Sequence, residues 1–198
     1  MNNKQKKIIL SLQVGLFLLA VFFGFRVIFD PNYNKVGGVL AGLVLPFLPQ
    51  IIKKVFKIEV RYLLQLTYLV FLLAALFFGI NMDFYKTIPF FDKVVHFFSG
   101  GLSIIVGLFA LRYYKLQKTP MLFRAVFIIS TCVFIGVLWE FFEFFCDKVL
   151  GQSMQQLISV GVDDTMWDLF SATLGASAGV IVMALGERSA VKNKKIVK

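Results

Sequence analysis

The sequence predicts an all-α protein, a polytopic transmembrane helical bundle of about six spans with both termini in the cytoplasm. Three observations predict this: an apolar composition, six long apolar runs and a one-sided distribution of basic residues. Of the 198 residues, 59% are hydrophobic and 16% are charged, whereas charged residues make up about a quarter of a typical soluble domain. No linker-like composition divides the chain, so we expect one integral membrane domain over residues 1–198.

The six apolar runs have the length that membrane-spanning helices need. Crossing about 30 Å of hydrocarbon takes roughly 20 helical residues at about 1.5 Å per residue. The runs cover residues 8–29, 36–52, 62–80, 94–111, 125–145 and 166–185. The second run is the shortest, and its "LPFLPQ" segment contains Pro46 and Pro49. Because a proline lacks a backbone donor and clashes with the preceding turn, we expect this helix to kink or end early.

The basic residues predict the orientation of the chain in the membrane. Sixteen of the 21 lysines and arginines lie before the first run or after the second, fourth and sixth runs: Lys4, Lys6, Lys7, Lys53, Lys54, Lys57, Arg61, Arg112, Lys115, Lys118, Arg124, Arg188, Lys192, Lys194, Lys195 and Lys198. If every run crosses once, these segments share one side, and the positive-inside rule makes that side cytoplasmic. We therefore predict a multi-pass protein of the cytoplasmic membrane.

The net charge of +10 does not predict a nucleic-acid partner. A nucleic-acid-binding groove interleaves basic residues with aromatic ones, and the basic segments of this chain show no such pattern. The partner that the composition predicts is the lipid bilayer, whose anionic headgroups attract basic residues next to a membrane span.

The only histidine and three acidic residues lie inside the last three runs at a similar predicted depth. His96 follows Asp92 by one helical turn, about 6 Å below the outer surface. By the same rise, Glu143 and Glu140 lie about 6 Å and 10 Å below that surface, and Asp168 lies about one turn below it. Charged groups in hydrocarbon need partners. We therefore expect carboxylates of the fifth and sixth runs to be the partners of Asp92 and His96.

Small residues continue each of these polar faces at helical spacing. They are Ser99 and Ser103 in the fourth run, Gly136 in the fifth, and Ser171, Gly175 and Gly179 in the sixth. Small residues let transmembrane backbones approach closely. We therefore expect the three polar faces to meet inside the bundle.

Three segments of these runs resemble the signature motifs of a known family. They are "DKVVHFFSGG" (92–101), "WEFFEFF" (139–145) and "DDTMWDLFSATLGA" (163–176). Their residue types, order and spacing are similar to those of the YjdF-like bacterial inner-membrane proteins, to which no biochemical activity is assigned. A more distant similarity is to VanZ-like membrane proteins, which are linked to glycopeptide-antibiotic resistance. That group usually has Gln at the position of Glu143 and Asn at that of Ala172, so the similarity implies no mechanism here.

An imidazole and several carboxylates form a ligand set suited to Zn, Mn, Fe or Ca. We predict a divalent metal ion as the cofactor, with the ligands His96, Glu143, Asp164 and Asp168. Such an ion would activate water, with Glu140 or Glu143 as the catalytic base, for hydrolysis of a lipid-linked or cell-envelope substrate at the outer leaflet. Further binding residues are predicted at Asp92, Trp139, Asp163 and Trp167.

Two other hypotheses fit the same residues. Intramembrane acids can relay protons, transport a solute or bind a cationic headgroup, or they can hydrogen-bond across helices only to hold the bundle together. A bound metal would favour the enzyme, a water-filled path would favour transport, and a closed dry network would favour the structural role. The segment "GQSMQQLISVG" (151–161) predicts an outer loop ordered over the cluster as a short helix or lid.

Overall fold

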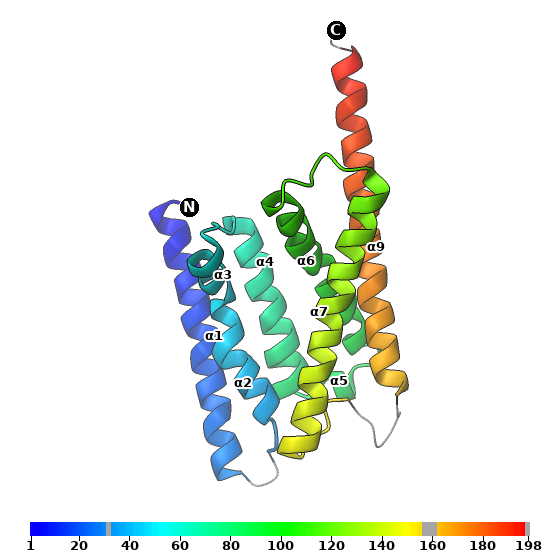
Figure 1. Cartoon of the computed structure of the whole chain (residues 1–198). Helices are drawn as coiled ribbons and strands as arrows, with labels where there is room; N and C mark the ends of the chain where they lie inside the picture. The colour runs from blue at the N-terminus through cyan, green and yellow to red at the C-terminus, as the bar shows by residue number, and fades with distance from the viewer. Residues whose placement is uncertain (31–32, 156–161, 197–198) are drawn as a thin grey trace. The chain divides into compact units, whose positions relative to one another are not determined.

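The computed structural model describes residues 1–30, 33–155 and 162–196, without the side chains of residue 188 and residues 190–196. The described residues are mostly helical and contain no strand (Figure 1). Six helical stretches are long and apolar enough to cross a membrane: Asn3–Phe29, Val36–Phe56, Tyr62–Asn81, Phe91–Tyr113, Met121–Leu150 and Asp163–Glu187. The predicted fold class, all-α with about six membrane spans, is therefore confirmed. The cytoplasmic placement of both termini stays a prediction.

Each of the six helical stretches extends beyond its apolar run at one end or at both. In chain order they are α1 (Asn3–Phe29), α2 (Val36–Val44), α3 (Leu48–Phe56), α4 (Tyr62–Leu72), α5 (Phe84–Thr87), α6 (Phe91–Tyr113), α7 (Met121–Leu150) and α9 (Asp163–Ile196). A 3-10 turn, η1 (Leu45–Phe47), joins α2 to α3, and a π-helix, η2 (Leu73–Asn81), continues α4. Helix α1 begins early because Asn2 and Gln5 form a reciprocal capping box.

The expected disruption at the prolines of the second span is observed, because α2 ends at Val44 and the α-helix resumes at Leu48 only after a 3-10 turn. Pro49 has no N–H to donate to the carbonyl of Leu45, and the hydroxyl of Tyr68 donates to that carbonyl at 2.9 Å. The side-chain amide of Gln13 donates to the carbonyl of Pro46 at 2.8 Å. Side chains of α1 and α4 thus satisfy carbonyls at the break, so the prolines produce a 3-10 turn within a longer helical stretch.

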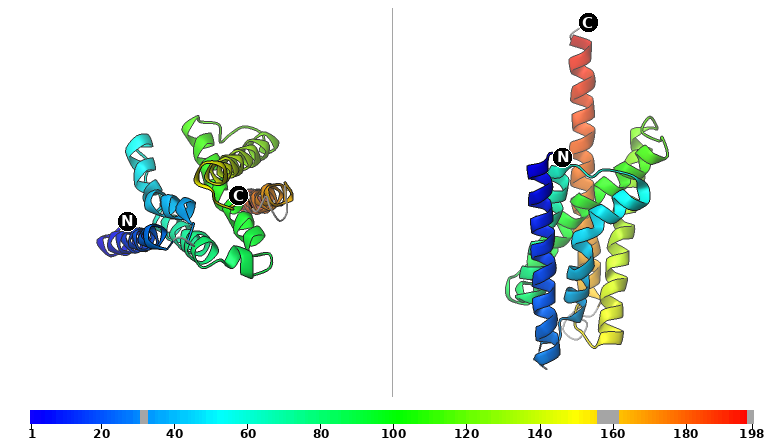
Figure 2. Two further views of the ribbon diagram at one scale, coloured as in Figure 1. Left: turned by 90° about the horizontal axis from the view of Figure 1, so that it is seen from below. Right: turned by 90° about the vertical axis from the view of Figure 1, so that its left-hand side faces the viewer.

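The helices form two compact units. The first contains Met1–Val95 and Glu143–Met154, and the second contains His96–Phe142 and Gln155–Lys198. Within the first unit, α1 lies beside α2 and α4 (Figures 1 and 2). Within the second, α6, α7 and α9 pack together. The prediction of one domain stays a prediction.

Three polar side chains meet at one end of the first unit, where Tyr33 contacts both Arg26 and Asn81. The hydroxyl of Tyr33 donates to Asn81 at 2.7 Å, and the side-chain amide of Asn81 donates to the carbonyl of Leu76 at 2.7 Å. The guanidinium of Arg26 lies 4.2 Å from the centre of the Tyr33 ring. Burial raises the pKa of Tyr33 to about 12, although Arg26 opposes this shift. Tyr33 therefore stays neutral, and its hydroxyl helps to hold the end of the π-helix.

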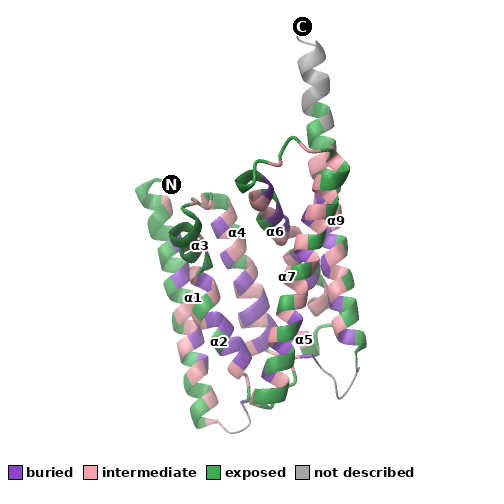
Figure 3. Cartoon of the chain, viewed as in Figure 1, coloured by how far each residue is buried: buried purple, intermediate pink, exposed green. Residues whose placement is uncertain are grey.

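The second unit has an apolar core to which all three of its helices contribute. The buried members are Ile104 and Leu111 of α6, Ile128 and Cys132 of α7, and Ala176 and Val180 of α9. Large apolar side chains elsewhere on these helices are exposed, and Figure 3 colours the exposed positions green. An example is Val182, which is 70% exposed. Exposed apolar faces of this kind suit a helix whose surroundings are lipid.

The predicted orientation can be tested by cysteine labelling. Met82 and Lys118 are both exposed, and the positive-inside rule places them on opposite sides of the membrane. In a variant without the two free cysteines, Cys132 and Cys146, we expect Met82→Cys to react with an impermeant thiol reagent in intact cells. Lys118→Cys should react only after the cells are permeabilised. The opposite pattern of reactivity would reverse the orientation.

Candidate functional site

A buried histidine and a buried aspartate face each other inside the second unit. His96 and Asp168 are each the sixth residue of their helix, α6 and α9. Their exposed fractions are 8% and 2%, and Nε2 of His96 lies 3.7 Å from Oδ1 of Asp168. This distance is longer than a hydrogen bond between the two atoms, yet it keeps them in electrostatic contact. The expected approach of His96 to a carboxylate of the sixth span is thus observed.

Small residues allow this pair to meet. A Cβ added to Gly100 would lie 1.9 Å from the carbonyl oxygen of Ala172, and one added to Gly175 would lie 1.9 Å from that of Phe97. The backbones of α6 and α9 therefore touch one turn beyond the His96–Asp168 pair. The series of contacts His96–Asp168, Gly100–Ala172 and Ile104–Gly179 advances in the same direction along both helices, so α6 and α9 run parallel. The predicted close approach at Gly175 is confirmed.

Asp92 lies one turn before His96 on α6 and is half-buried. Its carboxylate forms an ion pair with Lys93, whose Nζ lies 3.0 Å from Oδ2. The ion pair with the adjacent lysine was not predicted, and the expected carboxylate partner from the fifth or sixth span stays a prediction. Lys93 can balance the charge of Asp92 at the helix end because its long side chain folds back on the neighbouring residue.

A second polar group connects α7 to the first turns of α9. Nε2 of the buried Gln155 lies 3.5 Å from both the carbonyl and Oε2 of Glu140, and 3.3 Å from the hydroxyl oxygen of Thr165. Glu140 is 5% exposed. These are long hydrogen bonds, but they place the Glu140 carboxylate beside the first turn of α9. Of the predicted outer loop 151–161, residues 156–161 lie outside the described residues.

For the remaining predicted acids, Asp163, Asp164 and Glu143, the structure gives the burial and the position on the helix. Asp164 is buried and lies one turn before Asp168 on α9, whereas the neighbouring Asp163 is exposed. Glu143 is 9% exposed and lies almost one turn beyond Glu140 on α7, in the first unit. The roles of Asp164 and Glu143 as metal ligands stay predictions.

The match to a family model covers residues 9–189, under the description "Predicted membrane protein (DUF2238)". The chain belongs to the DUF2238 family. This is the YjdF-like family whose motifs the last three spans resemble, so that prediction is confirmed, while the VanZ-like similarity stays a prediction. A relative in Thermotoga maritima, described as an "Uncharacterized protein", is 31% identical over 166 residues, which cover 80% of this chain and 82% of the relative. No solved structure matches the chain.

The two tryptophans of the DUF2238 motifs have different surroundings. The half-buried ring of Trp139 lies 5.3 Å from that of Phe142, and Trp167, which is 58% exposed, meets Phe170 edge to face at 5.5 Å. Exposed indole rings are frequent at membrane interfaces. A substrate-binding role for Trp139 and Trp167 stays a prediction.

The sequence analysis did not predict several residues that contact the helices or side chains of the candidate site in this DUF2238 protein. Gly100 and Ala172 each follow a buried charged residue by four positions, and this spacing could have identified them as the closest helix contact. Gln155 and Thr165 gave no comparable signal. Gln155 precedes residues outside the described part of the chain, and its contact with Glu140 depends on the path of a loop, which periodicity does not predict.

Proposed function

We propose that this multi-pass membrane protein binds a divalent metal ion at His96 and Asp168 and acts on a lipid-linked or cell-envelope substrate. The observation that supports a metal site is the buried imidazole and carboxylate held 3.7 Å apart on two parallel helices. On the predicted orientation the site opens to the outer leaflet of the cytoplasmic membrane.

The separation of the two side chains fits shared ligation. Zinc binds histidine nitrogen and carboxylate oxygen at about 2.0–2.2 Å, so two ligands of one tetrahedral ion lie about 3.4 Å apart. The distance of 3.7 Å between Nε2 and Oδ1 needs only a small rearrangement to reach that value. A direct hydrogen bond would require a larger approach, to about 2.7–3.2 Å.

Other acids near the pair extend the ligand set. Asp164 precedes Asp168 by one turn on α9, and Asp92 precedes His96 by one turn on α6. Residues four apart lie on one helix face, so either carboxylate is a candidate third ligand. A bound divalent ion would supply Lewis acidity toward a phosphoryl or carbonyl oxygen of the substrate. Glu140, whose carboxylate Gln155 approaches within the second unit, is the candidate general base.

A lipid-linked substrate suits the surroundings of these helices. Phe170 and Trp167 of α9 are 52% and 58% exposed and lie next to the turn that carries Asp168. An apolar chain could lie along such a face while its polar headgroup reaches the carboxylates. A transporter would need a polar path through the bundle. Among the described residues of the second unit, the buried polar side chains are His96, Glu140, Gln155, Asp164 and Asp168, in the first turns of α6 and α9 and the second half of α7 or just after it.

Metal binding tests this proposal directly. Purified protein in detergent should be stripped with a chelator, reloaded with Zn²⁺ or Mn²⁺, and analysed by elemental analysis and titration calorimetry. We expect binding by the wild type and a loss of affinity of at least about tenfold for His96→Gln and Asp168→Asn, because each removes one ligand. Asp163→Asn removes an exposed carboxylate from the same first turns of α9 and should bind normally. Equal affinity for all four proteins, or binding by none, would refute the metal site.

A further inference from the structure

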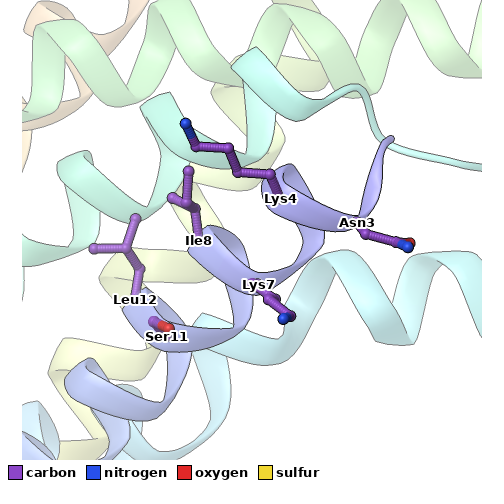
Figure 4. Close-up of a pocket in the computed structure, with 6 residues that line it drawn as sticks. All are labelled: Asn3, Lys4, Lys7, Ile8, Ser11 and Leu12. Atoms are coloured by element: carbon purple, nitrogen blue, oxygen red, sulfur yellow. The ribbon is translucent and has the colours of Figure 1, made fainter.

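A surface hollow of about 510 Å³ lies against the first turns of α1 in the first unit (Figure 4). The residues that line it are Asn3, Lys4, Lys7, Ile8, Ser11 and Leu12. All six residues belong to α1, so the hollow is an open surface of one helix and not an enclosed cleft. It is separate from the His96 and Asp168 site, which lies in the second unit.

The lining of the hollow combines two lysines near the start of α1 with apolar side chains that lie partly further along the helix. Lys4, Lys7 and Ser11 follow one another at spacings of three and four, so they lie along one face of α1. Ile8 and Leu12 lie beside this face and are 36% and 37% exposed. The first turn of α1 contains no acidic residue. The described residues give Lys4 and Lys7 no ion pair, so both ammonium groups are available to an anion.

We propose that this hollow binds the headgroup of an anionic phospholipid. The side chains of Lys4 and Lys7 leave α1 in different directions (Figure 4), but both are exposed and can turn toward a lipid phosphate, to which the hydroxyl of Ser11 can donate a further hydrogen bond. The acyl chains would then pass Ile8 and Leu12 and follow α1 into the hydrocarbon. A soluble anion would use the lysines alone, whereas the apolar side chains of the hollow match an amphiphile. On the predicted orientation this end of α1 faces the cytoplasmic leaflet, which carries anionic lipid.

Lys6 provides a matched control for this site. It lies on the same two turns of α1 and is exposed like Lys7, but it does not line the hollow. Lys6→Gln and Lys7→Gln remove the same charge from adjacent positions. General attraction to an anionic surface would be weakened equally by both, whereas a defined headgroup site depends on Lys7.

The experiment measures lipid binding by native mass spectrometry and by thermal shift in detergent, with phosphatidylglycerol and with phosphatidylcholine. We expect phosphatidylglycerol to bind the wild type and raise its melting temperature, and phosphatidylcholine to do neither. Lys7→Gln and Lys4→Gln should each weaken phosphatidylglycerol binding about fivefold, the effect expected of one lysine at an anionic surface. Lys6→Gln should bind like the wild type. Unchanged melting temperatures without lipid would show that the variants fold.

Two outcomes would overturn the proposal. Equal weakening by Lys6→Gln and Lys7→Gln would show diffuse electrostatic attraction without a site. Binding of glycerol 3-phosphate as tight as that of phosphatidylglycerol would show that the hollow takes a soluble anion and that its apolar side chains contribute nothing.

Discussion

Gly100→Ala is expected to destabilise the second unit by about 1–3 kcal/mol, the usual effect of forcing extra atoms into a close contact. The added Cβ would lie 1.9 Å from the carbonyl oxygen of Ala172 and 2.9 Å from its Cα. Both atoms belong to the backbone of α9, so no side-chain rotation can relieve the overlap. Helices α6 and α9 must move apart, and the melting temperature in detergent should fall by several degrees.

Gly101→Ala is the control for this substitution. A Cβ at Gly101 would find its nearest neighbour, the carbonyl oxygen of Gly175, at 3.9 Å, which is an ordinary contact. Alanine is also the better helix former by about 1 kcal/mol. The melting temperature of Gly101→Ala should therefore be unchanged or slightly raised. Equal melting temperatures for the two variants would contradict the close approach of α6 and α9.

The Gly100 contact should also control the metal site. His96 and Asp168 lie one turn from Gly100 and Ala172, so a separation of the helices there would lengthen the distance of 3.7 Å between Nε2 and Oδ1. We therefore expect Gly100→Ala to weaken divalent metal binding although it removes no ligand. Gly101→Ala should leave metal binding unchanged.

The sequence predicted the number and approximate position of the spans because hydrocarbon imposes a length and an apolar composition on each helix. It also predicted a disruption at Pro46 and Pro49, where α2 ends at Val44 and a 3-10 turn follows, but it did not predict how the stretch resumes as α3. The continuation depends on donors from other helices, such as the hydroxyl of Tyr68, which bonds the carbonyl of Leu45. A single proline-containing segment carries no information about such partners.

The candidate site was predictable to a similar degree. Helical rise placed His96 and Asp168 at one depth, and the structure brings them together. Depth alone does not determine which charged residues meet across helices, because each also has a direction around its helix. The ion pair between Asp92 and Lys93 and the contact of Gln155 with Glu140 depend on side-chain reach and loop path, which the periodicity of the sequence does not encode.

Asp168→Asn separates a metal site from a structural ion pair. If Asp168 serves a metal, the stripped wild type holds a buried carboxylate without its ion, so the near-isosteric amide should leave its melting temperature unchanged or raise it. If Asp168 instead balances a charge on His96, the amide leaves that partner buried without its counter-charge, which costs about 3–5 kcal/mol. The two roles therefore predict opposite changes in stability for the same substitution.

Melting temperatures of the wild type, Asp168→Asn, Glu143→Gln and Asp163→Asn, each with and without added Zn²⁺ or Mn²⁺, make this comparison. We expect the ion to stabilise the wild type, since a ligand at about 100 times its Kd adds about 2.7 kcal/mol to the free energy of unfolding. Asp168→Asn should lose this stabilisation and Asp163→Asn should keep it, because Asp163 is exposed. The response of Glu143→Gln decides whether Glu143 is a ligand. A wild type indifferent to the ions, together with an Asp168→Asn variant that melts well below it, would establish the pair as structural.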